Sequence, residues 1–270
     1  MRRSMAVLFV FTALCLACCT SALAWEAPCF SGTPDWQFAD GERAVQIKKV
    51  SDSTVTYFVA DVQLADASGF HTALSSGLSP VSDIASKTSA VLAVNGDDYG
   101  THQYGIIIRN GQLLRTHDTT RNMLIVDAAG DMSVRVDRKG EPYETLGQQM
   151  IDEGVRQTFE FGPELVRNGQ AVAFSPDFDV ISVKDSRKEP RTAIGQIGQL
   201  HYIIIVVDGR QDGYSLGMSL QEVQQLFIDY GAKTAMNLDG GGSAEMWFMG
   251  EVISSPSGGN ERYVSDIIWF

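Results

Sequence analysis

Residues 200–207, with the sequence LHYIIIVV, form a strongly apolar stretch that is rich in β-branched residues. Such a run predicts a central β-strand whose two faces are both buried. It ends at Asp208-Gly209-Arg210, where a polar turn begins. The rest of the predicted fold is built outward from this strand.

A helix is predicted directly downstream, over Ser219–Tyr230. Ser219 is placed as the N-cap and Glu222 follows three residues later, which is the pattern of a capping box. Apolar residues then recur at helical spacing, and Gly231 is placed to end the helix. A short strand over residues 234–238 completes a strand–helix–strand unit, which predicts parallel strands joined by a right-handed crossover.

This unit is expected to bring charged side chains together at one edge of the sheet. Asp208 follows the first strand and Asp239 ends the second, so both carboxylates are expected at the carboxyl edge of the sheet. If the two strands are adjacent, they lie about 4.8 Å apart, and both carboxylates can face one pocket. Residues 192–197 can also pair antiparallel with the run from Leu200 onward. If Ile197 faces Leu200, Arg191 faces Val206 and lies near Asp208, although turn signals alone do not fix this register.

Strands and hairpins account for most of the remaining chain. Residues 44–47 and 54–62 are predicted strands, and residues 89–94 are a short buried strand that ends at Asn95-Gly96. Three hairpins are expected, over residues 105–115, 123–136 and 165–172, and two of them turn at Asn-Gly. The predicted fold class is therefore α/β in a mixed α+β sense, with a mixed sheet, several antiparallel hairpins and one βαβ unit near the C-terminus. One domain is expected over residues 44–270, preceded by an extension over residues 25–43.

The N-terminus is predicted to be a signal peptide, residues 1–24. Two arginines precede an apolar run over residues 5–17, and Ala22-Leu23-Ala24 fits a cleavage site. The localisation expected is secreted, extracellular or cell-envelope, with no membrane span after cleavage; an uncleaved anchor is the alternative. Only Cys29 remains of the four cysteines, so no intrachain disulfide is expected in the mature protein. The net charge of −12 argues against a nucleic-acid partner, which requires a basic face.

The stretch Leu238-Asp239-Gly240-Gly241-Gly242-Ser243 carries the sharpest local signal. Three glycines allow the backbone to approach a ligand and to direct amide groups at an anion. The spacing matches no nucleotide-binding motif, and a simple tight turn is the other interpretation.

Metal chemistry has less support. Asp97 and Asp98 are candidate ligands, but a solvated turn explains them as well. The four histidines lack metal-ligand spacing, and neither HExxH nor GxSxG is present. The sequence therefore requires no cofactor, while a divalent metal stays open.

Several motifs in one order resemble the phosphodiester glycosidase family. They are residues 93–96, 190–195, 207–210, 237–243 and the pair Glu261-Arg262, and the similarity covers residues 44–270. Stretches 95–111 and 162–169 look like secreted bacterial members associated with exopolysaccharide. The chain departs from the family at Asp97-Asp98 and at Ala244-Glu245, and these departures concern the substrate more than the reaction class.

The resemblance implies a hydrolase that cleaves a sugar 1-phosphodiester, of the N-acetylglucosamine 1-phosphate type, between the anomeric carbon and the phosphate. The catalytic carboxylate is expected to be Asp239, then Asp208, then Glu261, acting on an oxocarbenium-like centre or on water. The expected substrate contacts are made by Asn95, Arg191, Arg210, Asn237, Gly240, Gly241, Gly242, Ser243 and Arg262. Arginines are expected to hold the phosphate through planar, multidentate donors. A metal-dependent phosphodiesterase that cuts the P–O bond and a non-catalytic module that binds envelope polysaccharide are the alternatives.

Overall fold

The computed structural model describes residues 25–136, 140–174 and 186–270. The expected signal peptide, residues 1–24, lies outside the described residues. Within the described ranges, no helix combines the length and the apolar character needed to cross a bilayer.

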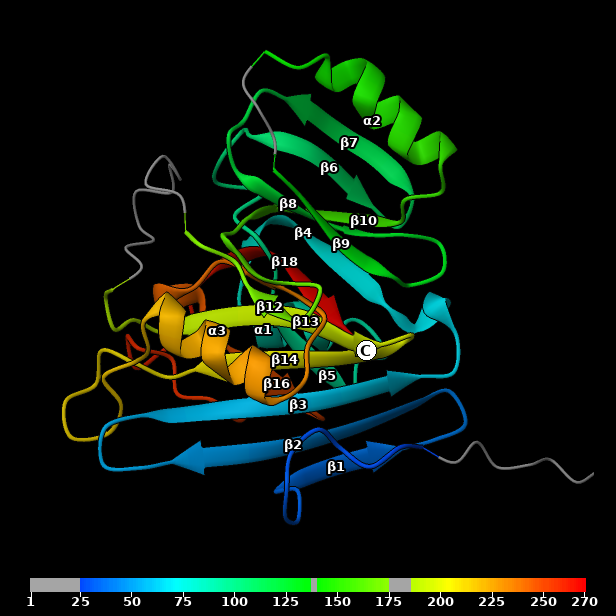
Figure 1. Cartoon of the computed structure of the whole chain (residues 1–270). Helices are drawn as coiled ribbons and strands as arrows, with labels where there is room; N and C mark the ends of the chain where they lie inside the picture. Colours follow the sequence, from blue (N-terminus) through cyan, green and yellow to red (C-terminus); the bar gives the residue numbers. More distant parts are fainter. Residues whose placement is uncertain (1–24, 137–139, 175–185) are drawn as a thin grey trace, which may run out of the picture.

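An eight-stranded sheet is the largest element of the fold (Figure 1). In spatial order its strands are β1 (Trp36–Ala39), β2 (Arg43–Ser51), β3 (Thr56–Leu64), β14 (His201–Val207), β13 (Arg191–Gly198), β15 (Thr234–Asn237), β11 (Glu164–Arg167) and β12 (Gln170–Ala171). The N-terminal segment belongs to this sheet, because β1 pairs with β2 and Cys29 donates its backbone N–H to Asp61.

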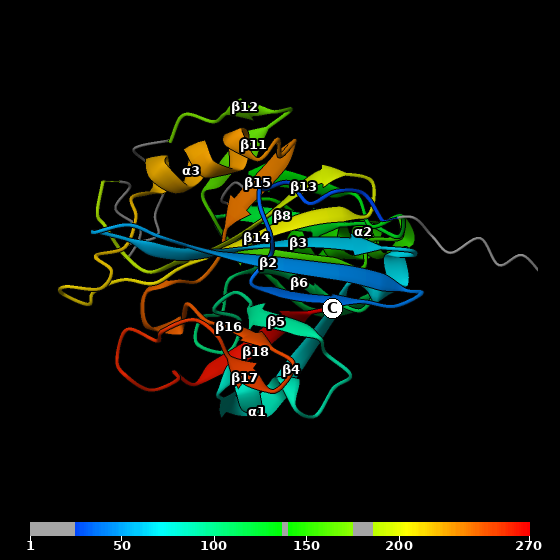
Figure 2. The same cartoon turned by 90° about the horizontal axis from the view of Figure 1, so that it is seen from below.

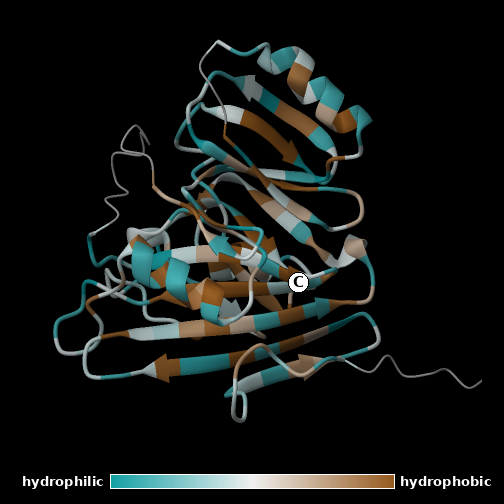
Figure 3. Ribbon diagram, in the orientation of Figure 1, coloured by the Kyte–Doolittle hydropathy of each residue, from teal (hydrophilic) through white to brown (hydrophobic). Residues whose placement is uncertain are grey.

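The predicted central strand, β14, is buried along its whole length. Ile204 and Val206 face a core shared with a second sheet, while Ile203 and Ile205 face the helix α3 (Leu220–Asp229). Figure 2 shows α3 on one side of the large sheet and the second sheet on the other. The hydropathy colouring agrees, since the inner strands are hydrophobic and the outer face of α3 is hydrophilic (Figure 3).

Smaller sheets complete the molecule. The second sheet has the order β17 (Glu251–Val252), β16 (Met246–Phe248), β5 (Leu92–Asn95), β18 (Val264–Trp269) and β4 (His71–Ser79), with helix α1 (Val81–Ala85) packed beside it. A three-stranded sheet has the order β10 (Gln157–Phe161), β8 (Asn122–Val126) and β9 (Met132–Val136). The hairpin β6 (Gly105–Arg109) with β7 (Gln112–His117) packs on helix α2 (Tyr143–Asp152). The short helices are η1 (Ala67–Gly69) and η2 (Gly241–Ser243).

The local predictions are confirmed. All three hairpins form, and the turn residues Asn110, Gly111, Asn168 and Gly169 have the positive φ that an Asn-Gly hairpin turn requires. The α3 helix begins after Ser219 with both bonds of the capping box present. The fold class is mixed α+β, as predicted.

The two strands of the predicted strand–helix–strand unit are parallel, as expected. They are not neighbours in the sheet, so the expected spacing of 4.8 Å between them is wrong. β13 lies between β14 and β15 and is antiparallel to both, so β14 and β15 are parallel without pairing. The register is also shifted by one residue: Arg191 lies opposite Val207 rather than Val206. The turn lies at Gln199-Leu200 rather than at Gly198-Gln199, because Gly198 is opposite His201, and a bulge at Ile197 then brings Arg191 opposite Val207.

Candidate active site

One edge of the large sheet collects the predicted site residues. Arg191 starts β13, Asp208 follows β14 and Asp239 follows β15, and all three therefore lie at the same end of neighbouring strands. The second sheet reaches this edge through Asn95 at the end of β5. Its side chain donates to the Asp239 carbonyl at 2.7 Å and accepts from the Thr192 hydroxyl at 2.7 Å.

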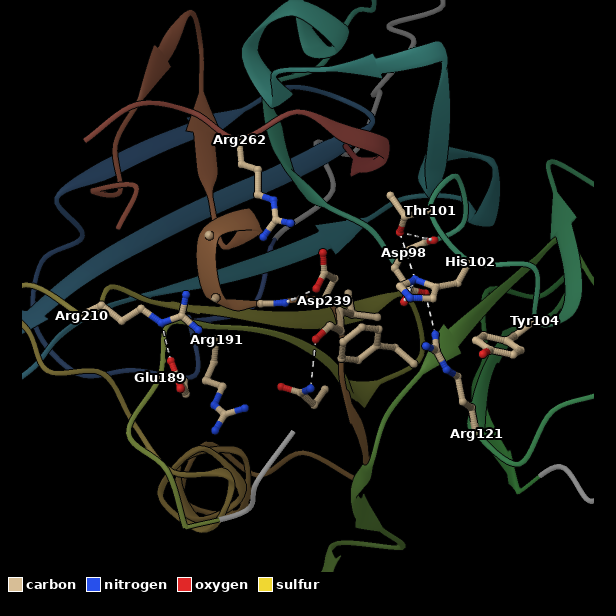
Figure 4. A pocket seen from close by; sticks show the side chains of 16 residues that line it. Asp98, Thr101, His102, Tyr104, Arg121, Glu189, Arg191, Arg210, Asp239 and Arg262 are labelled. Atoms are coloured by element: carbon tan, nitrogen blue, oxygen red, sulfur yellow. Dashed lines mark hydrogen bonds and ion pairs between the residues drawn. The ribbon is translucent and has the colours of Figure 1, made fainter. Parts of the chain in front are cut away.

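A cavity of about 450 Å³ opens at this edge (Figure 4). Its size is that of a small-molecule site. Residues from seven separate parts of the chain line it: Asp98, Thr101, His102, Tyr104, Arg121, Phe161, Glu189, Arg191, Arg210, Asn237, Leu238, Asp239, Gly240, Gly241, Gly242 and Arg262. Of the predicted residues, it brings together Asp239, the three glycines, Asn237 and the three arginines.

Asp239 is the best-placed carboxylate. Its side chain accepts from the Gly240 amide at 2.9 Å and also interacts with Ser243. Burial raises the pKa of Asp239 to about 6, with a further increase from the nearby Asp98, while Ser243, Gly240 and Arg262 act in the opposite direction. A carboxyl group with this pKa can hold or release a proton near neutral pH.

Most backbone amides of the glycine turn, Gly240–Ser243, already donate hydrogen bonds within the protein. The Gly240 amide bonds Asp239, the Gly241 amide bonds the Pro190 carbonyl at 2.9 Å, and the Ser243 amide bonds the Gly240 carbonyl. Only the Gly242 amide has no acceptor among the described residues. Gly240 and Gly241 are required by geometry. A Cβ on Gly240 would lie 2.8 Å from the Pro190 oxygen, and Gly241 has a φ of +59°.

Arginine side chains flank this turn. A Cβ on Gly241 would lie 3.1 Å from the Arg210 guanidinium, and one on Gly242 would lie 3.2 Å from Arg262. The two glycines therefore let both guanidinium groups reach the turn. Arg210 is paired with Glu189 at 2.5 Å, but Arg262 makes no hydrogen bond or ion pair with the described residues. Arg262 points into the cavity beside Asp239 (Figure 4) and is a free donor for an anion.

Backbone carbonyl groups fix the position of the Arg191 side chain. Its Nε donates to the Met218 carbonyl at 3.1 Å and one terminal nitrogen donates to Arg187 at 2.9 Å. Burial lowers the pKa of Arg191 to about 10, so the side chain remains cationic at neutral pH. It supplies fixed positive charge to the cavity wall.

The sequence analysis missed a second cluster on the opposite wall, centred on Asp98. Asp98 pairs with Arg121 at 2.6 Å and with His102 Nδ1 at 2.7 Å. The Arg121 guanidinium also lies over the ring of Tyr104 at 4.8 Å. The four-residue spacing of Asp98 and His102 was the only sequence signal for the pair. Arg121 comes from another part of the chain.

Asn237 forms part of the cavity floor beside Phe161. Its amide nitrogen donates to two carbonyls, Gly162 and Leu238, each at 2.9 Å, which fixes the orientation of the side chain. The Oδ1 atom is buried and has no partner among the described residues. A ligand that offers a hydroxyl or an N–H group would satisfy this atom.

Two predicted catalytic residues do not line this cavity. Asp208 is buried, accepts from the Tyr214 hydroxyl at 2.7 Å and from the Ser255 amide at 2.8 Å, and so ties two loops together. Burial raises the pKa of Asp208. Glu261 turns towards α1 and accepts from the Ser82 hydroxyl and amide at 2.6 and 3.0 Å. It also accepts from buried Glu245, whose pKa burial and this contact raise to about 9.

Asp97 and Asp98, the two candidate metal ligands, lie in different environments. Asp97 is buried and accepts from Arg109 at 3.0 Å, whereas Asp98 faces the cavity. Nowhere in the described ranges do three or more His, Cys, Asp or Glu side chains form a group suited to a metal ion. No ligand set is therefore assigned.

The cavity combines a carboxyl group of raised pKa, several arginines and an unpartnered amide oxygen, a set of groups suited to an anionic, polar ligand. The chain belongs to the phosphodiester glycosidase family, whose sequence profile matches residues 88–270.

The chain is also similar to individual proteins and solved structures. The chain is 30% identical over 195 residues to the SPbeta prophage-derived uncharacterized protein YomE of Bacillus subtilis; the match covers 70% of this chain but only 29% of that protein. The fold is similar to the catalytic domain of zebrafish N-acetylglucosamine-1-phosphodiester alpha-N-acetylglucosaminidase, auto-inhibited by its pro-peptide, with a TM-score of 0.66, 20% identity and coverage of 85% and 82%. It is also similar to a hypothetical protein from Synechocystis, with a TM-score of 0.55, 15% identity and coverage of 84% and 62%.

Proposed function

We propose that the chain hydrolyses a sugar 1-phosphodiester, of the N-acetylglucosamine 1-phosphate type, between the anomeric carbon and the phosphate oxygen. The observation that carries the proposal is the juxtaposition of Arg262, free of protein partners among the described residues, with Asp239 in one cavity. Family membership and the zebrafish structure support this choice of bond and sugar.

The arginines act on the phosphate. Arg262 and Arg210 lie against the glycine turn, and the Gly242 amide adds a neutral donor. Charge-assisted bonds from guanidinium groups suit a phosphate diester. They also stabilise the phosphate monoester that leaves, whose second pKa of about 6 makes it a good leaving group without full protonation.

Asp239 acts at the anomeric carbon. In its ionised form it stabilises the oxocarbenium-like centre or removes a proton from the attacking water. The C1–O bond breaks, its electron pair stays with the phosphate oxygen, and water supplies the new hydroxyl of the sugar. Asp98, held by Arg121 and His102, supplies negative charge on the other wall.

The sugar is placed in the part of the cavity that contains Asn237, Phe161 and Tyr104. The unpartnered Asn237 Oδ1 accepts from a sugar hydroxyl or from an acetamido N–H group. The aromatic rings offer apolar surface for a pyranose face. This assignment explains why a buried amide oxygen is left without a protein partner.

Oxygen-18 water separates the proposed reaction from P–O cleavage. With a methyl diester of α-N-acetylglucosamine 1-phosphate, we expect label in the released sugar and none in the phosphate. Label in the phosphate, together with loss of turnover in chelator, would favour a metal-dependent phosphodiesterase instead. No turnover of this substrate or of wall-polymer fragments would leave the polysaccharide-binding module as the better interpretation.

We also propose secretion, with envelope polymer or exopolysaccharide as the setting of the reaction. The support is the signal-peptide pattern of residues 1–24. N-terminal sequencing of the protein from culture medium or the cell envelope should give Trp25 as the first residue. Recovery of an uncleaved chain in the membrane fraction would contradict this.

A further inference from the structure

Glu245 is a buried acid that the proposed mechanism does not use. It lies two residues beyond the glycine turn, directly before β16, and only 2% of its surface is exposed. Its Oε1 atom is buried, and no N–H or hydroxyl group of the described residues donates to it. Because a buried carboxylate without donors is costly, these surroundings favour the neutral acid.

The group in contact with this acid is a second carboxyl group, since the side chains of Glu245 and Glu261 are hydrogen-bonded to each other. Two carboxyl groups form such a bond only when one of them holds a proton. Glu261 already accepts from the Ser82 hydroxyl at 2.6 Å and from the Ser82 amide at 3.0 Å, which favours its ionised form. The proton therefore resides on Glu245, which donates it to Glu261.

No positive charge balances the pair. In the part of the chain that the structure describes, no lysine, arginine or histidine forms an ion pair with Glu245 or Glu261. Asp239 and Arg262 face the cavity instead. The elements packed around the pair carry three further acids, none of which bonds either group: Asp83 in α1, Glu251 in β17 and Asp266 in β18, which is paired with Arg109. Without a cation, the shared proton is what allows the two carboxyl groups to remain in contact.

Arg262 follows Glu261 directly in the chain and points into the cavity beside Asp239 (Figure 4). The Arg262 side chain makes no hydrogen bond or ion pair with the described residues, so no contact of its own fixes it. Glu261 fixes the backbone before it, because Glu261 is tied to α1 through Ser82 and to the end of the glycine turn through Glu245.

We propose that Glu245 is a positioning residue for Arg262: its proton holds Glu261, and Glu261 holds the arginine at the phosphate site. The proposal rests on the proposed function for the role of Arg262, and it adds an upper pH limit to that site. Burial, followed by the hydrogen bond with Glu261, raises the pKa of Glu245 to about 9. Arg262 is therefore held below about pH 9 and released above it, where two carboxylates in contact repel each other.

Two substitutions separate the proton from the side chain that carries it. Glu245→Gln keeps an N–H donor for Glu261, whereas Glu245→Met removes the donor and keeps the length. With the methyl diester of α-N-acetylglucosamine 1-phosphate, Glu245→Met should lower kcat/KM by about tenfold, mainly through KM, and Glu245→Gln by less than about twofold. Glu251→Met, at an exposed glutamate of β17, is the matched control and should leave kcat/KM unchanged.

A double-mutant cycle tests whether Glu245 acts through Arg262. When Arg262 is already replaced in Arg262→Met, the further change Glu245→Met should lower kcat/KM by less than about twofold, because the side chain that it positions is gone. Equal losses in the two backgrounds would overturn the proposal and leave the proposed function intact.

The pH profile is a readout that a purely structural role would not change. Between about pH 8 and about pH 9.5, kcat/KM should fall about threefold more in the wild-type protein than in Glu245→Gln. Ionisation of Arg191, whose pKa is about 10, affects both proteins equally. Carbon-13 NMR of protein labelled at the glutamate carboxyl carbons should show one glutamate that titrates near pH 9 and is absent from Glu245→Gln. Identical profiles, or no glutamate with this titration, would overturn the proposal.

If the wild-type protein does not cleave the methyl diester, the proposed function fails and the binding of inorganic phosphate, measured by calorimetry, replaces kcat/KM. Over the same pH interval, the Kd for phosphate should rise about threefold more in the wild-type protein than in Glu245→Gln. Equal changes in the two proteins, or absent binding, would overturn the positioning role of Glu245 as well.

Discussion

Two clusters of arginine and carboxylate lie side by side in this protein, and they differ in how completely their charges are paired. In the closed cluster, Arg109 is buried and contacts Asp97 at 3.0 Å and Asp266 at 2.8 Å. In the open cluster, Asp239 and Arg262 face a cavity, and Arg262 has no bonded partner among the described residues. A closed cluster fixes structure, whereas an open one is available to a ligand.

The same comparison separates two adjacent residues. Asp97 and Asp98 follow β5, yet Asp97 belongs to the closed cluster while Asp98 lines the cavity. Asp97 also accepts from the Glu160 amide at 2.9 Å, which fixes the loop that presents Asp98. The closed cluster is therefore the support on which one wall of the open site is built.

The largest effect is expected in the open cluster, from Asp239→Asn. The change removes the group proposed to act at the anomeric carbon and keeps its size. We expect kcat to fall by about 10²–10⁴-fold, as for loss of an acid–base group. Steady-state turnover of the methyl diester measures this, with Asp229→Asn at an exposed position of α3 as the control. A variant with wild-type kcat would remove Asp239 from the mechanism.

A substitution in the closed cluster should lower the stability of the fold rather than act directly on catalysis. Although burial opposes its charge, Asp97 and Asp266 raise the pKa of Arg109. Arg109→Met leaves the buried Asp97 and Asp266 side chains without their cationic partner, and we expect a loss of about 3–5 kcal/mol in the free energy of unfolding. Urea denaturation measures it, and Arg156→Met, at an exposed arginine, should change the value by less than about 0.5 kcal/mol. A similarly small change in Arg109→Met would mean that the cluster is not a structural support.

Arg262→Met applies the same substitution to the open cluster and should reverse the pattern. Because Arg262 is exposed and bonds none of the described residues, the free energy of unfolding should stay within about 0.5 kcal/mol of the wild-type value. Catalytic efficiency, kcat/KM, should fall by about 10- to 100-fold, as for loss of a charge-assisted bond. Equal losses of stability in Arg109→Met and Arg262→Met would end the distinction between the clusters.

Local structure could be predicted from sequence because its causes are local. The Asn-Gly hairpins and the capping box at Ser219 each depend on residues within a few positions of one another. The edge that gathers Arg191 and Asp239 was also predicted, since strand direction follows from a hairpin and a crossover. The insertion of β13 between β14 and β15 was not, because no residue in the crossover encodes which strand fills the gap.

The site itself was only partly predictable, because partners decide the role of a carboxylate. Asp208 has the expected position in the chain, but Tyr214 and Ser255 engage both of its oxygens. Arg121 reaches Asp98 across a separation of 23 residues. One sequence read without its contacts cannot distinguish Asp97 from Asp98, nor Glu261 from Asp239.

The smallest expected effect is a pH dependence that also separates the clusters. Burial, followed by the charge of Asp98, raises the pKa of Asp239 to about 6, so kcat/KM should fall about tenfold per pH unit below that value as the carboxylate is protonated. A limb near pH 4 instead would show that the acting carboxylate has an ordinary environment.

The free energy of unfolding should also depend on the ionisation of Asp239, but in the opposite direction to activity: ionisation of Asp239 lowers stability. The folded protein holds the Asp239 proton more tightly than the unfolded chain does, so this contribution is present below about pH 4 and is lost as the pH rises through about 6. Asp239→Asn has no such loss and should therefore be more stable than the wild-type protein at pH 7, by about 2 kcal/mol, with the difference vanishing near pH 4. Burial, followed by the charge of Asp97, raises the pKa of Asp266, and the charge of Asp239 is among the smaller causes. The substitution therefore also eases ionisation of Asp266 and acts in the same direction. Urea unfolding at both pH values measures the difference, and a variant less stable than the wild type at pH 7 would mean that Asp239 is held for the fold rather than for the ligand.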